Sequence, residues 1–410
     1  MIIVVGSGAG GATVAKELAL SGLSVTLIEK GPLIKTKNAF HNYDPTDYGL
    51  DLLKTTCGGG STMVAAGNGV RVLQKELHSM GIDISSQLSD AEQELGVKPL
   101  PDSHQGDGTK ILKDSARALN LDVIPMPKFI RPGECKPCGK CAFGCPRDAK
   151  WTSMDFVKQA QKAGANVIFN TEVNNLIIEE DTIKGVNISS RQDASADFEK
   201  TSTLNSNQVV LAAGAIETAR ILQKSGIEAG DSFFMDTFVT VGGILEGVGF
   251  NEEVTMNALI EGDNFILAPH FSTFISQKLK KKGAHDRDIL GLMVKIKDEF
   301  SGRITTERVI KYNTLQDVRF LAEGSAVAGS ILSAAGVKPD TIVSTHPRGA
   351  HPGGTAPIGK TVDENLETKI KGLFVADASV LPLAPGAPPI LTIIALAKRL
   401  AGYLIENQAQ

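Results

Sequence analysis

The first thirty residues alternate between short apolar runs and a glycine-rich turn. The runs "IIVV" and "VTLI" have the composition of buried strands, and the segment between them carries Val14, Leu18 and Leu20 at a spacing that suits a helix. This pattern predicts a strand–turn–helix–strand unit, which is the usual opening of an α/β fold with a parallel sheet.

Two later stretches, 209–226 and 370–382, again place an apolar run before glycine, and an amphipathic helix is predicted from Ile390 to Ile405. We expect them to return to the same sheet after insertions. Residues 70–130 read as mostly helical and polar, whereas alternating apolar runs within 233–335 predict an antiparallel sheet. The predicted fold class is α/β: a discontinuous Rossmann-like nucleotide-binding domain plus a smaller α+β domain with an antiparallel sheet.

The chain has 410 residues, which is too long for one small core, and its net charge of −4 gives no general attraction to nucleic acid. It starts almost directly in a strand, without room for a secretory signal, and its longest apolar stretch, 390–397, is too short for a membrane span. We therefore expect a cytoplasmic protein with no membrane span and no nucleic-acid partner. Whether it is a homo-oligomer or a complex subunit stays open.

The first turn carries the spacing G-x-G-x-x-G at Gly6, Gly8 and Gly11. The first glycine of such a turn permits a tight bend, the second lets a pyrophosphate approach the backbone, and the third lets helix and strand pack closely. Glu29 ends the second strand, where a carboxylate accepts ribose hydroxyls and repels a 2′-phosphate. The motif predicts a dinucleotide other than NADP, but it does not separate FAD from NAD.

Four of the five cysteines lie close together and read C-x₂-C-x₂-C-x₃-C-P. Bacterial ferredoxins hold iron–sulfur clusters with this run. We predict that Cys135, Cys138, Cys141 and Cys145 bind such a cluster, with [4Fe–4S] preferred, [3Fe–4S] left open, and Cys57 an alternative fourth ligand. Zinc, whose structural sites pair two C-x₂₋₄-C units across a longer spacer, and a structural remnant are the rival interpretations.

Several further motifs resemble the glucose–methanol–choline (GMC) family of FAD oxidoreductases. "CGGGSTMVAAGNGVR" at 57–71 looks like the family's glycine-rich segment, "GAIETARILQKSG" is similar to its second signature, and "HPGGTAPIG" with "VADASVLP" resembles its C-terminal segment. On this basis we expect an FAD-binding domain made of 1–75, 150–232 and 340–410. A helical segment with the cysteine cluster would occupy 76–149, and a trimmed substrate domain 233–339.

The resemblance implies FAD rather than NAD as the cofactor. The positions that match the family's FAD contacts lie in the N-terminal unit, the glycine-rich segment, one central strand and the C-terminal segment. They are Gly6, Gly8, Gly11, Glu29, Gly59, Gly60, Ser61, Asn68, Val173 (through its backbone), Asp377, Ala378 and Thr392.

Alcohol oxidation by a flavin requires a group that takes the hydroxyl proton near neutral pH, and histidine suits that step. His351, in "AHPGGT", falls on the family's catalytic position, whereas His346 and His270 are interpreted as structural. The family usually has an asparagine or histidine where Pro388 stands here. Proline offers neither a side-chain hydrogen bond nor an N–H, so either another group orients the alkoxide or the chemistry differs from ordinary alcohol oxidation.

The sequence therefore predicts an FAD-dependent dehydrogenase of the GMC type that acts on a CH–OH group of a small alcohol-type substrate. Hydride would pass to flavin N5, and the cluster would export the electrons singly to an external acceptor such as a ferredoxin or another redox protein. The alternative is a non-catalytic flavin and iron–sulfur electron-transfer subunit of a larger redox complex.

Overall fold

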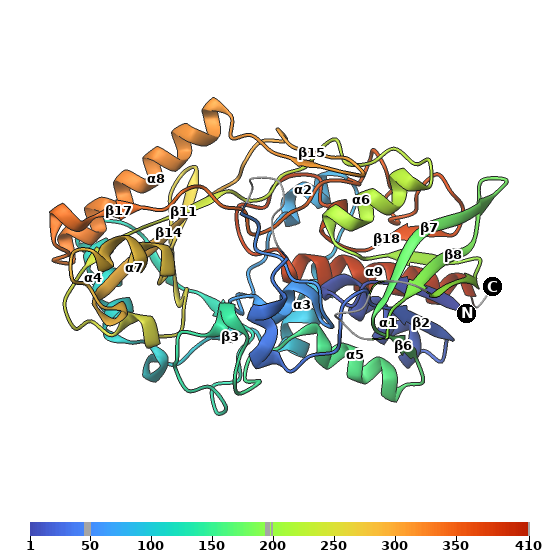
Figure 1. Ribbon diagram of the computed structural model, residues 1–410, viewed down its shortest axis with the longest axis horizontal. Helices are drawn as coiled ribbons and strands as arrows, with labels where there is room; N and C mark the ends of the chain where they lie inside the picture. The colour runs from blue at the N-terminus through green and yellow to red at the C-terminus, as the bar shows by residue number, and fades with distance from the viewer. Residues whose placement is uncertain (45–50, 193–196, 198–199, 409–410) are drawn as a thin grey trace.

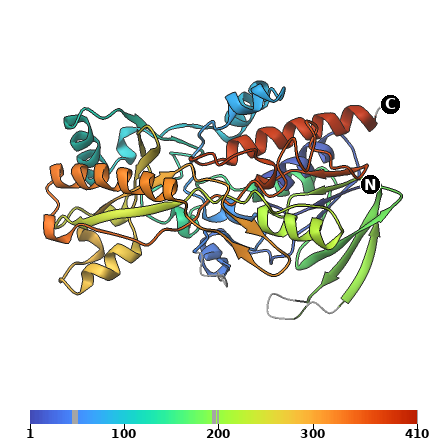
Figure 2. The ribbon, with the colours of Figure 1, turned by 90° about the horizontal axis from the view of Figure 1, so that it is seen from above.

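The computed structural model describes residues 1–44, 51–192, 197 and 200–408 of the chain. The molecule is elongated, with a parallel sheet near the chain termini and an antiparallel sheet towards the opposite end (Figure 1). The long helix α8 (Leu315–Ala334) lies at that far end, and α9 (Ile390–Gln408) lies at the end of the termini (Figure 2). No helix within the described residues combines the length and the apolar character needed to cross a membrane.

Five parallel strands form the first sheet, and they come from the beginning, the middle and the end of the chain. Their order is β18 (Leu373–Val375), β10 (Val209–Leu211), β1 (Ile2–Val5), β2 (Val25–Ile28) and β6 (Asn166–Ile168). The first four of these strands are buried along their whole length, as their largely apolar sequences predict. The predicted discontinuous Rossmann-like sheet is therefore confirmed.

Helix α1 (Ala9–Leu20) packs against both α5 (Ser153–Lys162) and α9. It starts very close to the sheet, because a Cβ added to Gly10 would lie 1.6 Å from the Ala376 carbonyl oxygen. A Cβ added to Gly11 would likewise lie 1.9 Å from the Gly6 carbonyl oxygen. Glycine at both positions lets the helix lie against the strand ends, which is the role that the motif predicts for Gly11.

Smaller elements surround this sheet. A three-stranded antiparallel sheet of β7 (Thr171–Glu179), β8 (Thr182–Ser190) and β9 (Lys200–Asn205) contacts α6 (Ala215–Lys224). The other short elements are α2 (Gln74–Ser79), α3 (Ser85–Leu95), the pair β3 (Lys98–Pro99) and β5 (Pro127–Lys128), and the pair β15 (Arg303–Ile304) and β16 (Val309–Ile310).

Six antiparallel strands form the second large sheet. Their order is β17 (Val343–Ser344), β11 (Phe238–Ile244), β14 (Ile289–Ile296), β13 (Phe265–Pro269), β12 (Ala258–Glu261) and β4 (Val123–Pro125). Helices α8 and α4 (Asp107–Ala118) pack on this sheet, and α7 (Thr273–Lys280) contacts β11. The antiparallel sheet that the alternating pattern predicts is confirmed.

Two features of this part differ from the sequence pattern. The stretch 233–335 contains the 20-residue helix α8 as well as strands, because glycine and serine interrupt the helical signal there. Strand β4 lies in the stretch 70–130, for which the sequence predicted mostly helix. The pattern did not indicate this strand, because it has three residues and none of them is buried. The predicted domain boundaries stay predictions.

Candidate active site

A cavity with about 1930 Å³ of empty space extends from the carboxyl ends of β1, β2 and β10 to the antiparallel sheet. Ten of the thirteen residues predicted to bind the cofactor or to catalyse line it: Gly6, Gly8, Glu29, Gly60, Ser61, Asn68, Val173, His351, Asp377 and Ala378. Gly11, Gly59 and Thr392 are not among the lining residues.

The last three residues have contacts within the protein. Thr392 donates a hydrogen bond to the Val72 carbonyl at 2.8 Å, and the Gly59 N–H donates to the Ser7 hydroxyl at 2.9 Å. Gly11 packs against the start of the glycine turn. Direct contact of these three residues with a cofactor stays a prediction.

The glycine end of the cavity is shaped for an anion. Helix α1 begins at Ala9 directly after Gly8, and no side chain caps it. A Cβ added to Gly8 would meet no protein atom within 4 Å, so this lining residue leaves open space for a ligand. The unpaired N–H groups and the dipole of a helix N-terminus favour negative charge. This end of the cavity therefore fits the pyrophosphate of a dinucleotide.

Two buried carboxylates fix the strand ends around this site. Glu29 accepts hydrogen bonds from the Ser7 N–H at 2.9 Å and from the Gly31 N–H at 2.7 Å. Asp377 accepts from the Gly214 N–H at 2.8 Å and from the Thr218 hydroxyl at 2.6 Å. Burial raises the pKa of both carboxyl groups, and the hydrogen bonds oppose that rise.

At the other end of the cavity, His351 lies on a loop that is paired with residues 234–238. The His351 N–H donates to the Met235 carbonyl, and its ring Nδ1 lies 2.8 Å from the carboxylate of Asp236. Asp236 is fully buried, and its other oxygen accepts from the Gly386 N–H at 2.9 Å. Once Asp236 is ionised it can only accept, so Nδ1 carries the proton and Nε2 is left as a base.

Burial acts on both members of this pair. It raises the pKa of Asp236, and it lowers the pKa of His351 well below the usual value, with the charge of Lys295 adding to the second effect. Both shifts disfavour a net charge at this place. The pair of neutral imidazole and ionised carboxylate therefore takes up one proton readily and resists a second.

The two other histidines considered from the sequence differ in their surroundings. His270 lines the cavity, its Nδ1 lies 3.1 Å from the Thr240 hydroxyl, and burial lowers its pKa to about 3. His346 is 54% exposed, lies 3.4 Å from the Asp51 carboxylate, and is not among the residues that line the cavity.

Asp236 and Lys295 are site residues that sequence reasoning did not identify. Lys295 is the one charged residue in β14, a strand whose residues are all buried. A lysine within such an apolar run is the sequence signal that could have identified it. Asp236 adopts a left-handed backbone conformation (φ 48°), for which the sequence gives no signal. Pro388 does line the cavity, at the start of α9, so the site lacks the side-chain donor expected there.

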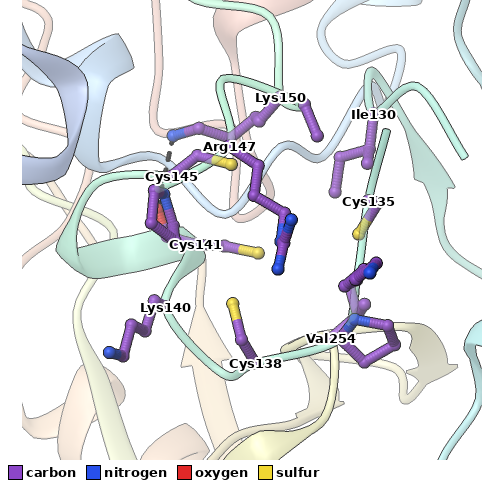
Figure 3. A pocket seen from close by; sticks show the side chains of 13 residues that line it. Ile130, Cys135, Cys138, Lys140, Cys141, Cys145, Arg147, Lys150 and Val254 are labelled. Atoms are coloured by element: carbon purple, nitrogen blue, oxygen red, sulfur yellow. Dashed lines mark hydrogen bonds between the residues drawn. The ribbon is translucent and has the colours of Figure 1, made fainter. Parts of the chain in front are cut away.

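A second pocket, with about 350 Å³ of empty space, is lined by Cys135, Cys138, Cys141 and Cys145. The sulfur atoms of Cys135, Cys138 and Cys141 turn towards the same space in Figure 3. Cys57 lines neither pocket; it is buried, with its sulfur 3.9 Å from the Thr55 hydroxyl.

No group of three or more His, Cys, Asp or Glu side chains in the described part of the chain is arranged to hold a single metal ion. An iron–sulfur cluster makes a different demand, since each thiolate binds a different iron and the sulfurs surround a wider space. Burial and the neighbouring thiols raise the pKa of Cys135 to about 11, and burial raises the pKa of Cys141. Both shifts favour the protonated form of these two thiols.

Two buried lysines lie in the wall between the two pockets. Lys150 donates to the carbonyls of residues 62, 63 and 65 at 3.0, 3.1 and 2.5 Å, and lies 3.4 Å from the Cys141 carbonyl. Lys128 donates to the Asn68 side chain at 2.5 Å. Burial lowers the pKa of Lys128 to about 7 and that of Lys150 to about 8. Residue Ala142, next to Cys141, lines the large cavity, so the pockets share a thin wall.

The class of protein follows from the fold and the large cavity. Residues 4–59 match a family model described as an NAD(P)-binding Rossmann-like domain, in agreement with a dinucleotide-binding protein. Two models described as GMC oxidoreductase match residues 56–254 and 304–397. The chain belongs to the GMC oxidoreductase family, and it is an FAD-dependent oxidoreductase.

Relatives of known sequence span most of the chain. An uncharacterized protein of Methanocaldococcus jannaschii is 36% identical over 97% of both chains. An uncharacterized GMC-type oxidoreductase of Mycobacterium tuberculosis is 27% identical over 99% of this chain and 76% of its own length. A long-chain-alcohol oxidase of Arabidopsis thaliana is 24% identical over 99% of this chain and 66% of its own length.

Among solved structures, pyridoxine 4-oxidase from Mesorbium loti superimposes with a TM-score of 0.75 over 98% of each chain. The sequence identity is 16%, so this likeness shows that the two proteins have the same fold.

Proposed function

We propose that the chain oxidises a CH–OH group of a small alcohol-type substrate with FAD as the hydride acceptor. The observation that carries this proposal is the His351–Asp236 pair at the cavity, in which Asp236 is fully buried and His351 is partly exposed. Bound FAD supplies the oxidant at its N5 position. His351 takes the hydroxyl proton at Nε2, and Asp236 holds the ring by Nδ1. The Arabidopsis relative is a long-chain-alcohol oxidase, which supports an alcohol as the substrate.

The test is anaerobic mixing of the purified FAD-loaded protein with a panel of alcohols, aldehydes and reduced protein donors. Bleaching of the flavin absorption by at least one alcohol supports the proposal. Bleaching by protein donors alone would refute alcohol oxidation and support the alternative, a non-catalytic electron-transfer subunit. The absence of a side-chain donor at Pro388 is consistent with that alternative.

The pH dependence of flavin reduction gives a prediction for Asp236→Asn. As the pH falls through the raised pKa of Asp236, the wild-type pair takes up a proton and His351 no longer acts as a base. The rate should therefore fall at a pH well above the usual pKa range of carboxyl groups. In Asp236→Asn the lone imidazole titrates at its lowered pKa, so the acidic limb should move to lower pH while the maximal rate drops. Stopped-flow absorbance between pH 4 and 9 measures both. An acidic limb that stays in place would show that the pair does not control it.

We also propose that Cys135, Cys138, Cys141 and Cys145 bind an iron–sulfur cluster, [4Fe–4S] in preference to [3Fe–4S], which exports the electrons one at a time. The ferredoxin-type spacing and the common pocket of the four thiols support it. The two buried lysines would offset the negative charge of bound thiolates. The thin wall between the pockets favours electron transfer from the flavin.

The cluster proposal predicts different outcomes for two cysteine substitutions. Cys145→Ser is expected to lose most of the cluster while it keeps FAD, and Cys57→Ser to keep both, since Cys145 lines the pocket and Cys57 does not. The measurement is iron, acid-labile sulfide and EPR after anaerobic purification and reconstitution. Stoichiometric zinc without sulfide in the wild type would refute the cluster.

The acceptor that we propose is an acidic one-electron carrier of the ferredoxin class. Lys136, Lys140 and Arg147 are exposed at the rim of the cysteine pocket, and Lys35 and Lys37 are exposed on the adjoining segment, which packs against it. This positive rim is a local feature, since the chain as a whole is negatively charged, with a net charge of −4. Opposite charge on the carrier would steer its approach.

A further inference from the structure

Lys295 lies on the side of β14 that faces the cavity. Side chains alternate along a strand, and Leu292, Val294 and Ile296 belong to the core that includes residues of α8. The residues between them, Met293 and Lys295, line the cavity instead. The strand therefore presents a lysine to the same space that His351 faces.

The ammonium group of Lys295 is buried and has spare donors. Lys295 is 4% exposed, and among the described residues its Nζ donates to the Asp236 carbonyl at 3.3 Å, a long bond. It lies 5.2 Å from the centre of the Phe238 ring. An ammonium has three N–H donors, so at least two remain for a ligand, and a buried donor without a partner costs stability.

The neighbouring charges do not neutralise this cation completely. The nearby Asp298 carboxylate already forms an ion pair with Lys311 at 2.8 Å, and Asp236 holds His351. Lys295 is close enough to lower the pKa of His351 and of His270, which both line the cavity. Lys295 and His351 thus line the same cavity, and both contact Asp236.

Pro388 leaves the site without the side-chain donor expected at the start of α9. We propose that Lys295 is the missing donor: its ammonium binds the substrate's hydroxyl oxygen opposite His351 and stabilises the negative charge that develops there. This inference rests on the proposed oxidation of an alcohol. The hydroxyl proton goes to His351. Burial lowers the pKa of Lys295 to about 8, so its ammonium form prevails at neutral pH and keeps its protons during the step. A fixed cation in a site without water stabilises such charge strongly.

The test compares Lys295→Met, which has a similar length and no charge, with Lys295→Arg, which keeps the charge. Lys297→Met is the matched control, because Lys297 is exposed two positions further along the chain and pairs with Glu76 at 3.4 Å. We expect Lys295→Met to lower the limiting rate of anaerobic flavin reduction by about 100-fold or more. Lys295→Arg should be less impaired. Lys297→Met should stay close to the wild type, because the charge of Lys297 is the smallest of the effects on the pKa of Asp236.

A second readout does not need turnover. Formate, a small oxyanion, is titrated into each FAD-loaded variant, and its binding is followed by the shift of the flavin absorption. Lys295→Met should bind formate at least about tenfold more weakly than Lys297→Met and the wild type. Wild-type reduction rates in Lys295→Met, or slow reduction with unchanged formate binding, would overturn the inference. If no alcohol reduces the wild-type flavin, the proposed function fails, and the formate titration still decides whether Lys295 binds an oxygen ligand.

Discussion

Replacing His351 with alanine is expected to slow the reduction of bound FAD by an alcohol about 10²–10⁴-fold, because the hydroxyl proton loses its acceptor. His351 lies at the far end of the cavity from the glycine turn, so the variant should keep its FAD. Anaerobic stopped-flow absorbance measures the rate, and the ratio of flavin to protein absorbance measures the cofactor.

His346→Ala is the matched control for this variant. His346 stands five residues earlier in the same segment, but it is exposed and contacts Asp51 and Phe274 rather than the cavity. Its removal should leave the reduction rate within a factor of about two, as for an exposed residue outside the site. An unchanged rate in His351→Ala, or equal losses in both variants, would remove His351 from the chemistry.

The site residues that were predicted correctly belong to motifs that a short stretch of sequence is enough to identify. Gly6, Gly8 and Glu29 belong to one strand–turn–helix–strand unit, and the structure brings all three to the cavity. Four of the five strands of the parallel sheet were visible as short apolar runs, since a strand buried on both faces needs no alternation. The edge strand β6 is not buried, and its sequence did not predict it.

The residues that were missed acquire their role through pairing of distant segments. Asp236 meets His351 across 115 residues of sequence, and only the folded path of both loops brings them together. The alternation in β14 shows that Lys295 shares a face with Met293, but not that this face turns to the cavity. Which face is buried against α8 depends on the packing of the whole sheet.

The cysteine run is an intermediate case. Its spacing predicts that four thiols converge, but whether Cys145 or Cys57 completes the set depends on how the loop docks. A Cβ on Gly144 would lie 2.0 Å from the Thr36 carbonyl oxygen, and one on Gly139 would lie 1.9 Å from the Asn251 carbonyl oxygen. These two close approaches hold the loop so that Cys145 lines the pocket.

Gly10→Ala is expected to destabilise the whole FAD-binding part and to abolish retention of the cofactor. The new Cβ would stand 1.6 Å from the carbonyl oxygen of Ala376, at the end of β18, and backbone at that place cannot rotate away as a side chain can. Helix α1 must therefore move off the sheet, which displaces its N-terminus from the site of the pyrophosphate. We expect the free energy of unfolding to fall by about 3 kcal/mol or more.

Gly402→Ala provides the control, because it makes the same change in α9, where the added Cβ meets no atom within 4 Å. Alanine restricts the unfolded chain more than glycine, so this variant should be about 0.5–1 kcal/mol more stable than the wild type. Urea unfolding of both variants, with the flavin content of each preparation, separates the close approach at Gly10 from the general effect of losing a glycine. Equal unfolding midpoints, with full FAD in Gly10→Ala, would contradict the tight contact between α1 and β18 on which the position of the cofactor depends.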